Sequence, residues 1–88
     1  MPRGETNKLP DPKPSVKAYF MAIVKRGTEH DVAKRLGKME GVTEAIVTYG
    51  LWDIIARIEA PNLSQLDSLI TEMRKMEDIV QTSTLLGA

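Results

Sequence analysis

Cysteine is absent from this chain of 88 residues, and histidine occurs only once. Without cysteine there is no disulfide framework, and one histidine is too few for a conventional structural zinc site. An excess of either charge is also lacking, because 12 Lys and Arg balance 12 Asp and Glu. Domains that bind nucleic acids normally carry a basic excess, so we expect no direct contact with DNA or RNA.

Long apolar runs are missing too, since none approaches the roughly 20 residues that a transmembrane helix needs. We therefore expect no membrane span, no signal peptide and a cytoplasmic location. Four of the five prolines fall within residues 1–16, where almost nothing is apolar. Closely spaced prolines disfavour a helix, so this composition predicts a flexible tail at 1–16 and a single domain at 17–88.

Four segments have the composition of β-strands. Apolar residues fill both alternating faces of the first segment, which is typical of a central strand covered on two sides. Turn-forming residues separate the segments from one another. The predicted strands cover residues 17–24, 42–49, 52–60 and 79–86.

Two amphipathic helices are predicted between the strands. The first begins after Thr28, with Asp31 as its partner in a capping pair, and ends at Gly41. The second begins after Asn62, which matches a capping box with Gln65. The order β-α-β-β-α-β, with right-handed crossovers, places both helices on one face of an antiparallel sheet. We therefore expect an α+β protein with a ferredoxin-like fold.

The face of the sheet opposite the helices should be polar, but its residues are not. Tyr19, Met21 and Ile23 occupy one face of the first strand, and further apolar residues occupy the other. An exposed apolar face of several hundred Å² is exceptional on a soluble monomer. The pattern predicts a back-to-back homodimer, which makes the whole an α/β sandwich or barrel.

The most distinctive motif lies at residues 47–60, where two strand-like runs meet at Gly50 and Leu51. Glycine suits the first central position of a two-residue type II′ turn, because φ must be positive there. Asp53 follows, next to Trp52, the only tryptophan of the chain. A carboxylate in this position suits an ammonium group. It equally suits a solvated charge that discourages edge-to-edge pairing.

Hydroxyl groups form a second candidate site on the last strand. Thr82 and Thr84 share one face there, about 7 Å apart, where they suit a small polar ligand or act simply as good strand formers. His30 has no identifiable nucleophile or carboxylate partner, and no glycine-rich phosphate loop is present. The sequence therefore predicts no catalytic residue, no metal ligand and no cofactor.

Four segments together resemble the effector-binding (RAM) domain of the Lrp/AsnC family of bacterial and archaeal regulators. They cover residues 18–21, 41–45, 49–60 and 82–85, and the resemblance extends over about 17–86. It implies a dimeric α/β sandwich that assembles into octamers or other rings. It also implies that an amino acid binds in clefts between neighbouring dimers.

The same resemblance implies roles for individual residues. Those assigned to the cleft are Tyr49, Gly50, Leu51, Trp52, Asp53, Thr82 and Thr84. Backbone amides near Gly50 would bind the carboxylate of the ligand, and Asp53 its ammonium group. Full-length members of the family carry a helix-turn-helix where this sequence has its proline-rich segment. We therefore expect a stand-alone RAM domain, for which a full-length paralogue is a further partner.

Two other interpretations remain open. One is a small dimeric α/β-barrel enzyme, such as a cofactor-free monooxygenase, which shares the sheet-to-sheet dimer. Such an enzyme needs polar groups in a cavity between helices and sheet, where this sequence places apolar residues. The other is a purely structural partner of a full-length regulator.

Overall fold

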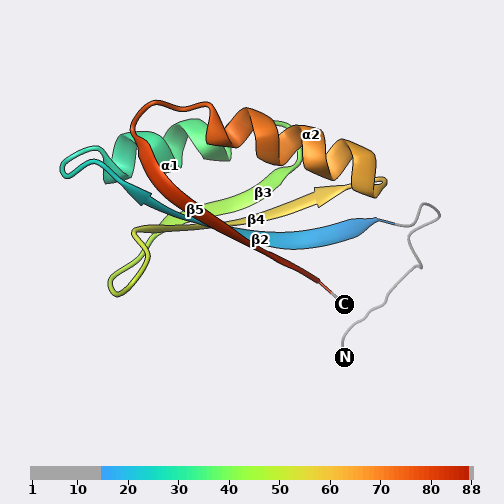
Figure 1. Ribbon diagram of the computed structural model, residues 1–88, viewed down its shortest axis with the longest axis horizontal. Helices are drawn as coiled ribbons and strands as arrows, with labels where there is room; N and C mark the ends of the chain where they lie inside the picture. Colours follow the sequence, from blue (N-terminus) through green and yellow to red (C-terminus); the bar gives the residue numbers. More distant parts are fainter. Residues whose placement is uncertain (1–14, 88) are drawn as a thin grey trace.

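The computed structural model describes residues 15–87, so nearly all of the tail predicted at 1–16 lies outside the described residues. The elements are β2 (Val16–Val24), α1 (Glu29–Gly37), β3 (Val42–Val47), β4 (Ile54–Ala60), α2 (Leu63–Arg74) and β5 (Ile79–Leu86). The strands form one antiparallel sheet in the order β3-β4-β2-β5, and both helices lie on the same face of it (Figure 1). The predicted α+β, ferredoxin-like architecture is confirmed.

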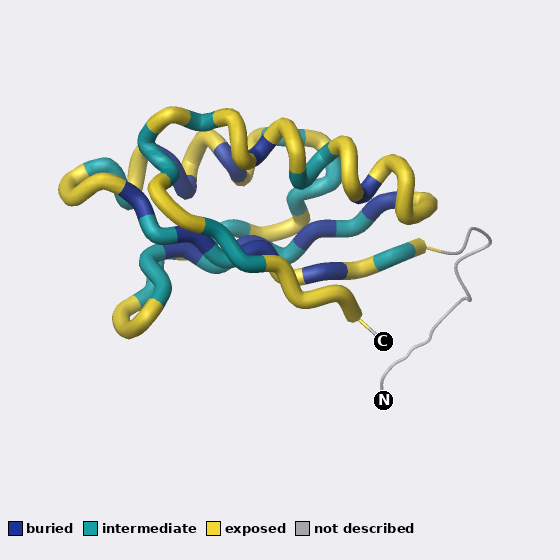
Figure 2. The backbone as a smooth tube through the Cα atoms, viewed as in Figure 1, coloured by how far each residue is buried: buried dark blue, intermediate teal, exposed yellow. Residues whose placement is uncertain are grey.

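The core lies between the helices and the sheet (Figure 2). Every second residue of the central strands β2 and β4 is buried there, and Phe20, Ile54 and Ile58 are completely buried. The helices contribute the stripes that their apolar spacing predicts, with Leu36 from α1 and Met73 from α2 fully buried. Alternation in the strands and the 3.6-residue period in the helices thus account for the core.

Within residues 15–87, no element covers the other face of the sheet, which is apolar, as predicted. Tyr19 lies opposite Leu85 of β5, and Met21 lies opposite Ile55 of β4, which in turn pairs with Ile46 of β3. Tyr19 is 46% exposed, Ile46 47% and Leu85 59%. Large apolar side chains therefore span all four strands on the face without helices.

Two predicted helix signals differ from the structure. The Thr28 hydroxyl donates to the carbonyl of Lys25 at 2.6 Å and does not cap α1, because Thr28 has φ −101° and ψ 1° and lacks the extended backbone typical of a capping residue. The first helix ends at Gly37, four residues before Gly41. Gly41, with φ +98°, instead begins the return into β3, and its carbonyl accepts the N–H of Glu59 at 2.8 Å.

The cap predicted for the second helix is confirmed. The side-chain oxygen of Asn62 accepts the backbone N–H of Gln65 at 2.9 Å, and Asn62 has the extended backbone of a capping residue. The last strand also has the predicted bounds, from Ile79 to Leu86. Both signals are local, so the sequence alone is enough to place them.

Candidate functional site

The loop that joins β3 to β4 is longer than the predicted two-residue turn. The backbone N–H of Thr48 donates to the carbonyl of Asp53 at 2.8 Å, so four residues, 49–52, lie inside the closing bond. The N–H of Asp53 does not return to β3; it donates to the carbonyl of Ala22 in β2 at 2.9 Å. The type II′ prediction is therefore wrong, although Gly50 does adopt a positive φ of +135°.

A side-chain hydrogen bond braces the same loop. The Thr48 hydroxyl donates to the carbonyl of Trp52 at 2.7 Å, next to the backbone bond between Thr48 and Asp53. Trp52 is half-buried, whereas Tyr49 is 101% exposed and Leu51 80% exposed. The loop therefore has a hydrogen-bonded base and an apolar tip, which projects away from the helices (Figure 1).

Asp53 has a structural partner that its position in the sequence does not reveal. Its Oδ2 atom accepts the backbone N–H of Val24 at 3.0 Å, and the side chain is half-buried. Together with the bond to Ala22, this contact fixes the end of β2 against the β3–β4 loop. An ionised carboxylate has about four lone-pair sites. The bond to Val24 is therefore compatible with an additional ammonium partner.

The two threonines share one face of β5, as predicted. Thr82 pairs with Ala22 and Thr84 with Phe20, so both lie on the face that carries the helices. Thr82 is half-buried and Thr84 exposed, because β5 is an edge strand. Since Ala22 also accepts the N–H of Asp53, only strand β2 separates Asp53 from Thr82.

Within one copy, the seven candidate residues therefore fall into two groups. Asp53 and Thr82 lie on either side of the end of β2, whereas Tyr49 and Leu51 extend into solvent from the loop. Tyr49 and Leu51 are thus exposed on the part of the chain that the structure describes.

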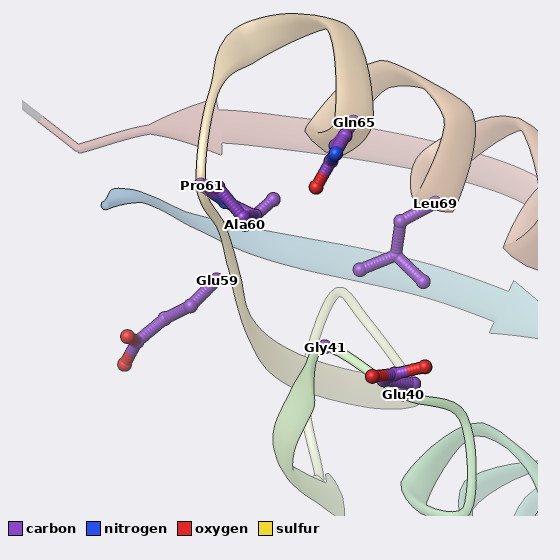
Figure 3. Close-up of a pocket in the computed structure, with 7 residues that line it drawn as sticks. All are labelled: Glu40, Gly41, Glu59, Ala60, Pro61, Gln65 and Leu69. Carbon is purple, nitrogen blue, oxygen red and sulfur yellow. The ribbon is translucent and has the colours of Figure 1, made fainter. Parts of the chain in front are cut away.

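A cleft of about 410 Å³ lies at the other end of β4 (Figure 3). Gln65 and Leu69 of α2 form one side of it, and Glu40 and Gly41 the other. A Cβ atom on Gly41 would be 2.8 Å from Cδ2 of Leu69 and 3.1 Å from the carbonyl oxygen of Glu59, so a larger residue would force one of these groups to move.

The cleft is completed by the segment that links β4 to α2. Ala60 and Pro61 add apolar surface. The side chain of Glu59 points away from the cleft (Figure 3), and its Oε2 atom lies 3.3 Å from Nη2 of Arg57. The sequence analysis did not identify this cleft. Gly41 and Gln65 were noticed only as a helix terminator and a capping partner, because the cleft unites three segments that are distant in the sequence.

Among residues 15–87 there is no group of three or more His, Cys, Asp and Glu side chains that could hold a metal ion. None of the helices that the structure describes is long and apolar enough to cross a membrane. The candidate site therefore has one anchored carboxylate, two hydroxyls, an apolar loop tip and a separate cleft that Glu40 borders. This chemistry suits a small zwitterion or a protein contact.

Comparison with known proteins shows the family of this chain. The model of the Lrp/AsnC ligand-binding domain matches residues 17–86. The chain belongs to the Lrp/AsnC family. An uncharacterized HTH-type transcriptional regulator of Pyrococcus furiosus is 30% identical over 61 residues, and a second from Pyrococcus abyssi is 27% identical over the same length. Each match covers 68% of this chain but only 41% of the longer relative.

Solved structures share the fold of this chain. A hypothetical protein of Pyrococcus horikoshii is 39% identical, with a TM-score of 0.79, and the match covers 83% of this chain and 89% of that one. AsnC of E. coli, 24% identical with a TM-score of 0.73, has the same fold over 82% of this chain and 50% of its own. The expected family and its RAM fold are therefore confirmed.

Proposed function

We propose that this RAM domain binds an amino acid in a regulatory role and couples that binding to the assembly of identical dimers. The family match supports ligand binding, and the curated relatives are named as transcriptional regulators. Phe20, Leu36 and Met73 fill the space between the helices and the sheet. A barrel-type enzyme would need its substrate cavity there, so this packing supports regulation over catalysis.

The carboxylate of Asp53 carries the amino-acid proposal. It is held in place by the N–H of Val24, which lowers the entropic cost of engaging the ammonium group of a ligand. In the same proposal the loop amides near Gly50 bind the carboxylate of the amino acid, and the hydroxyls of Thr82 and Thr84 supply further hydrogen bonds. The tip residues then surround its side chain.

A homodimer through the uncovered sheet face is the second part of the proposal. Complete burial of an apolar side chain the size of Leu or Ile contributes about 1.5–3 kcal/mol. Tyr19, Ile46 and Leu85 are each about half exposed in one copy, so an identical sheet laid over them buries considerable apolar area. Two-fold symmetry makes such a contact self-complementary.

Assembly beyond the dimer gives the ligand its regulatory effect. Because Tyr49 and Leu51 extend into solvent within one copy, we place the ligand between dimers, where it stabilises the larger ring, such as an octamer, by mass action. The coupling is reciprocal, so assembly strengthens ligand binding by the same factor. A full-length paralogue with the same domain is a further partner for this contact.

Isothermal titration calorimetry with a panel of amino acids tests this proposal. Asp53→Asn keeps a side-chain oxygen for the N–H of Val24 but removes the negative charge, so it separates ligand binding from the structural contact. We expect one or a few amino acids to bind, and this variant to bind them roughly 10- to 100-fold more weakly, as loss of a charge-assisted hydrogen bond predicts.

Asp67→Asn is the matched control, because it removes an exposed charge from α2 and should leave the affinity unchanged. Failure of the wild type to bind any amino acid would contradict the proposal. Equal affinities of Asp53→Asn and the wild type would contradict the role of Asp53.

A further inference from the structure

The uncovered sheet face carries a charged patch beside its apolar residues, formed by Lys17, Glu44, Arg57 and Glu59. Lys17 of β2 lies opposite Glu59 of β4, and Arg57 of β4 lies opposite Glu44 of β3. Residues directly opposite each other in antiparallel strands project from the same face of the sheet. Within β4, Oε2 of Glu59 lies 3.3 Å from Nη2 of Arg57. Each cation of the charged patch therefore has an anion beside it.

The charged patch is continuous with the apolar part of the same face. Tyr19 lies directly opposite Arg57, and the sheet side from which both project carries no helix (Figure 1). Tyr19 is 46% exposed, and the side chains of Arg57 and Glu59 are 40% and 29% exposed. A partner that covers the ring of Tyr19 therefore also removes water from the neighbouring guanidinium group.

The loss of water determines what the covering surface must offer. A guanidinium group has more N–H donors than one carboxylate can accept, so Glu59 leaves part of Arg57 without an acceptor. Burying a charge is costly unless it is paired and hydrogen-bonded. A surface that covers the charged patch therefore needs an anion opposite Arg57 and a cation opposite Glu59.

A second copy of this chain meets that requirement through symmetry alone. In a back-to-back dimer, the two-fold axis lies between the two sheets and runs parallel to them. Where such an axis passes between neighbouring charges of opposite sign, it brings the cation of each copy over the anion of the other. Arg57 and Glu59 are neighbours of this kind, so their order along β4 is self-complementary.

We propose that Arg57 of one copy pairs with the partner's Glu59 across the sheet face, and Glu59 with the partner's Arg57. The order of these charges thereby selects a second copy of this chain as the partner. The inference rests on the proposed function, because it uses the proposed dimer, and it adds what decides which chains pair. A sheet without this order of charges leaves Arg57 unpaired or opposite a like charge, which disfavours a mixed dimer.

Reversal of single charges tests the pairing. Arg57→Glu gives β4 two neighbouring carboxylates, and Glu59→Arg gives it two neighbouring guanidinium groups. Each variant alone should dimerise about tenfold or more weakly than the wild type, because like charges then face each other. When the two variants are mixed, opposite charges meet, so the mixed dimer should be about tenfold or more tighter than either homodimer. Analytical ultracentrifugation of each variant and of the mixture measures these affinities.

Exchange of the two charges tests the selection of the partner. The double variant Arg57→Glu with Glu59→Arg keeps a self-complementary order, so it should form homodimers as the wild type does. In a mixture with the wild type, like charges face each other, and mixed dimers should form about tenfold or more weakly than homodimers. Native mass spectrometry counts the species, with one chain isotope-labelled because the exchange leaves the mass unchanged.

The exposed ion pair on α2 provides the matched control. Nζ of Lys75 lies 3.6 Å from Oε1 of Glu72, away from the sheet face. Lys75→Glu and Glu72→Lys, alone or together, should therefore dimerise as the wild type does and mix freely with it.

Free mixing of the double-exchange variant with the wild type would overturn the inference, as would single reversals that pair no better together than alone. If the charge variants behave in this way while Tyr19→Lys still weakens the dimer, the selection by charge is wrong and the proposed sheet-face dimer stands. A wild type that stays monomeric at all concentrations contradicts both.

Discussion

The carboxylate of Asp53 accepts the backbone N–H of Val24 at 3.0 Å, although 29 positions separate the two residues in the sequence. This bond joins the loop between β3 and β4 to the end of the central strand β2. It gives Asp53 a structural role beside the ligand-binding role that we propose. The two roles are separable by substitution, because an amide oxygen can replace the carboxylate as acceptor but not as a charge.

Asp53→Ala should destabilise the domain by about 1–3 kcal/mol, because it leaves the N–H of Val24 without its side-chain acceptor. Asp53→Asn should recover most of that loss. Urea denaturation followed by circular dichroism measures both free energies of unfolding. If the alanine and asparagine variants are equally stable, the hydrogen bond to Val24 does not contribute to stability.

Gly41→Ala should be more harmful than Gly27→Ala. Both glycines have positive φ, +98° and +90°, so each alanine variant should lose about 1–2 kcal/mol through backbone strain. A Cβ on Gly41 also meets Leu69 Cδ2 at 2.8 Å and the backbone carbonyl oxygen of Glu59 at 3.1 Å, whereas one on Gly27 meets nothing within 4 Å. Overpacking should therefore cost Gly41→Ala about 1–3 kcal/mol more. Equal melting temperatures for the two variants would contradict the close packing between Gly41 and α2.

Thr48→Val should loosen the loop without unfolding the sheet. The valine keeps the shape of threonine but loses the hydroxyl that donates to the carbonyl of Trp52 at 2.7 Å. Amide hydrogen exchange of residues 49–52 should become faster. Thr43→Val is the control, because the Thr43 hydroxyl bonds to Arg57 outside the loop, at 3.1 Å. Loop exchange that is the same in both variants would show that the Thr48 hydroxyl does not brace the tip.

Tyr19→Lys should weaken the proposed dimer, because it places a charge on the uncovered sheet face opposite Leu85. Thr71→Lys adds the same charge to the exposed side of α2 and should leave the dimer intact. Analytical ultracentrifugation over a range of concentrations measures both dissociation constants. A dimer that tolerates lysine at position 19 would place the interface elsewhere.

Local patterns were enough to predict most of the fold. The bounds of β5 and the cap at Asn62 depend on neighbouring residues only, and the apolar residues on both sides of β2 indicated that both faces of the sheet are apolar. The Thr28 cap failed because its hydroxyl found a competing acceptor, the carbonyl of Lys25, within the preceding turn.

The site was less predictable, because its geometry depends on tertiary contacts. A glycine followed by strand-like residues matches a two-residue turn. In the structure, the N–H and the carboxylate of Asp53 bond to strand β2, and only its carbonyl bonds to Thr48, so the loop contains four residues. Gly41, Pro61 and Leu69 line the same cleft, although no sequence motif or short spacing connects them. The sequence pointed to Asp53 because of its residue type and its place after a glycine turn. It did not point to the cleft, because a concave surface depends on how distant segments pack together.

The mass of the assembly, measured by size-exclusion chromatography with light scattering in the presence and absence of each amino acid, tests the central claim most directly. With a chain of 9.8 kDa, dimers and larger rings are readily separated. We expect at least a dimer without ligand, and one or a few amino acids that shift the mass distribution or its concentration dependence. For Asp53→Asn the same shift should need roughly 10- to 100-fold more of the amino acid, as its weaker binding predicts. A mass that no amino acid changes would contradict coupled binding and assembly, and a monomer at all concentrations would also contradict the dimer predicted from the uncovered sheet face.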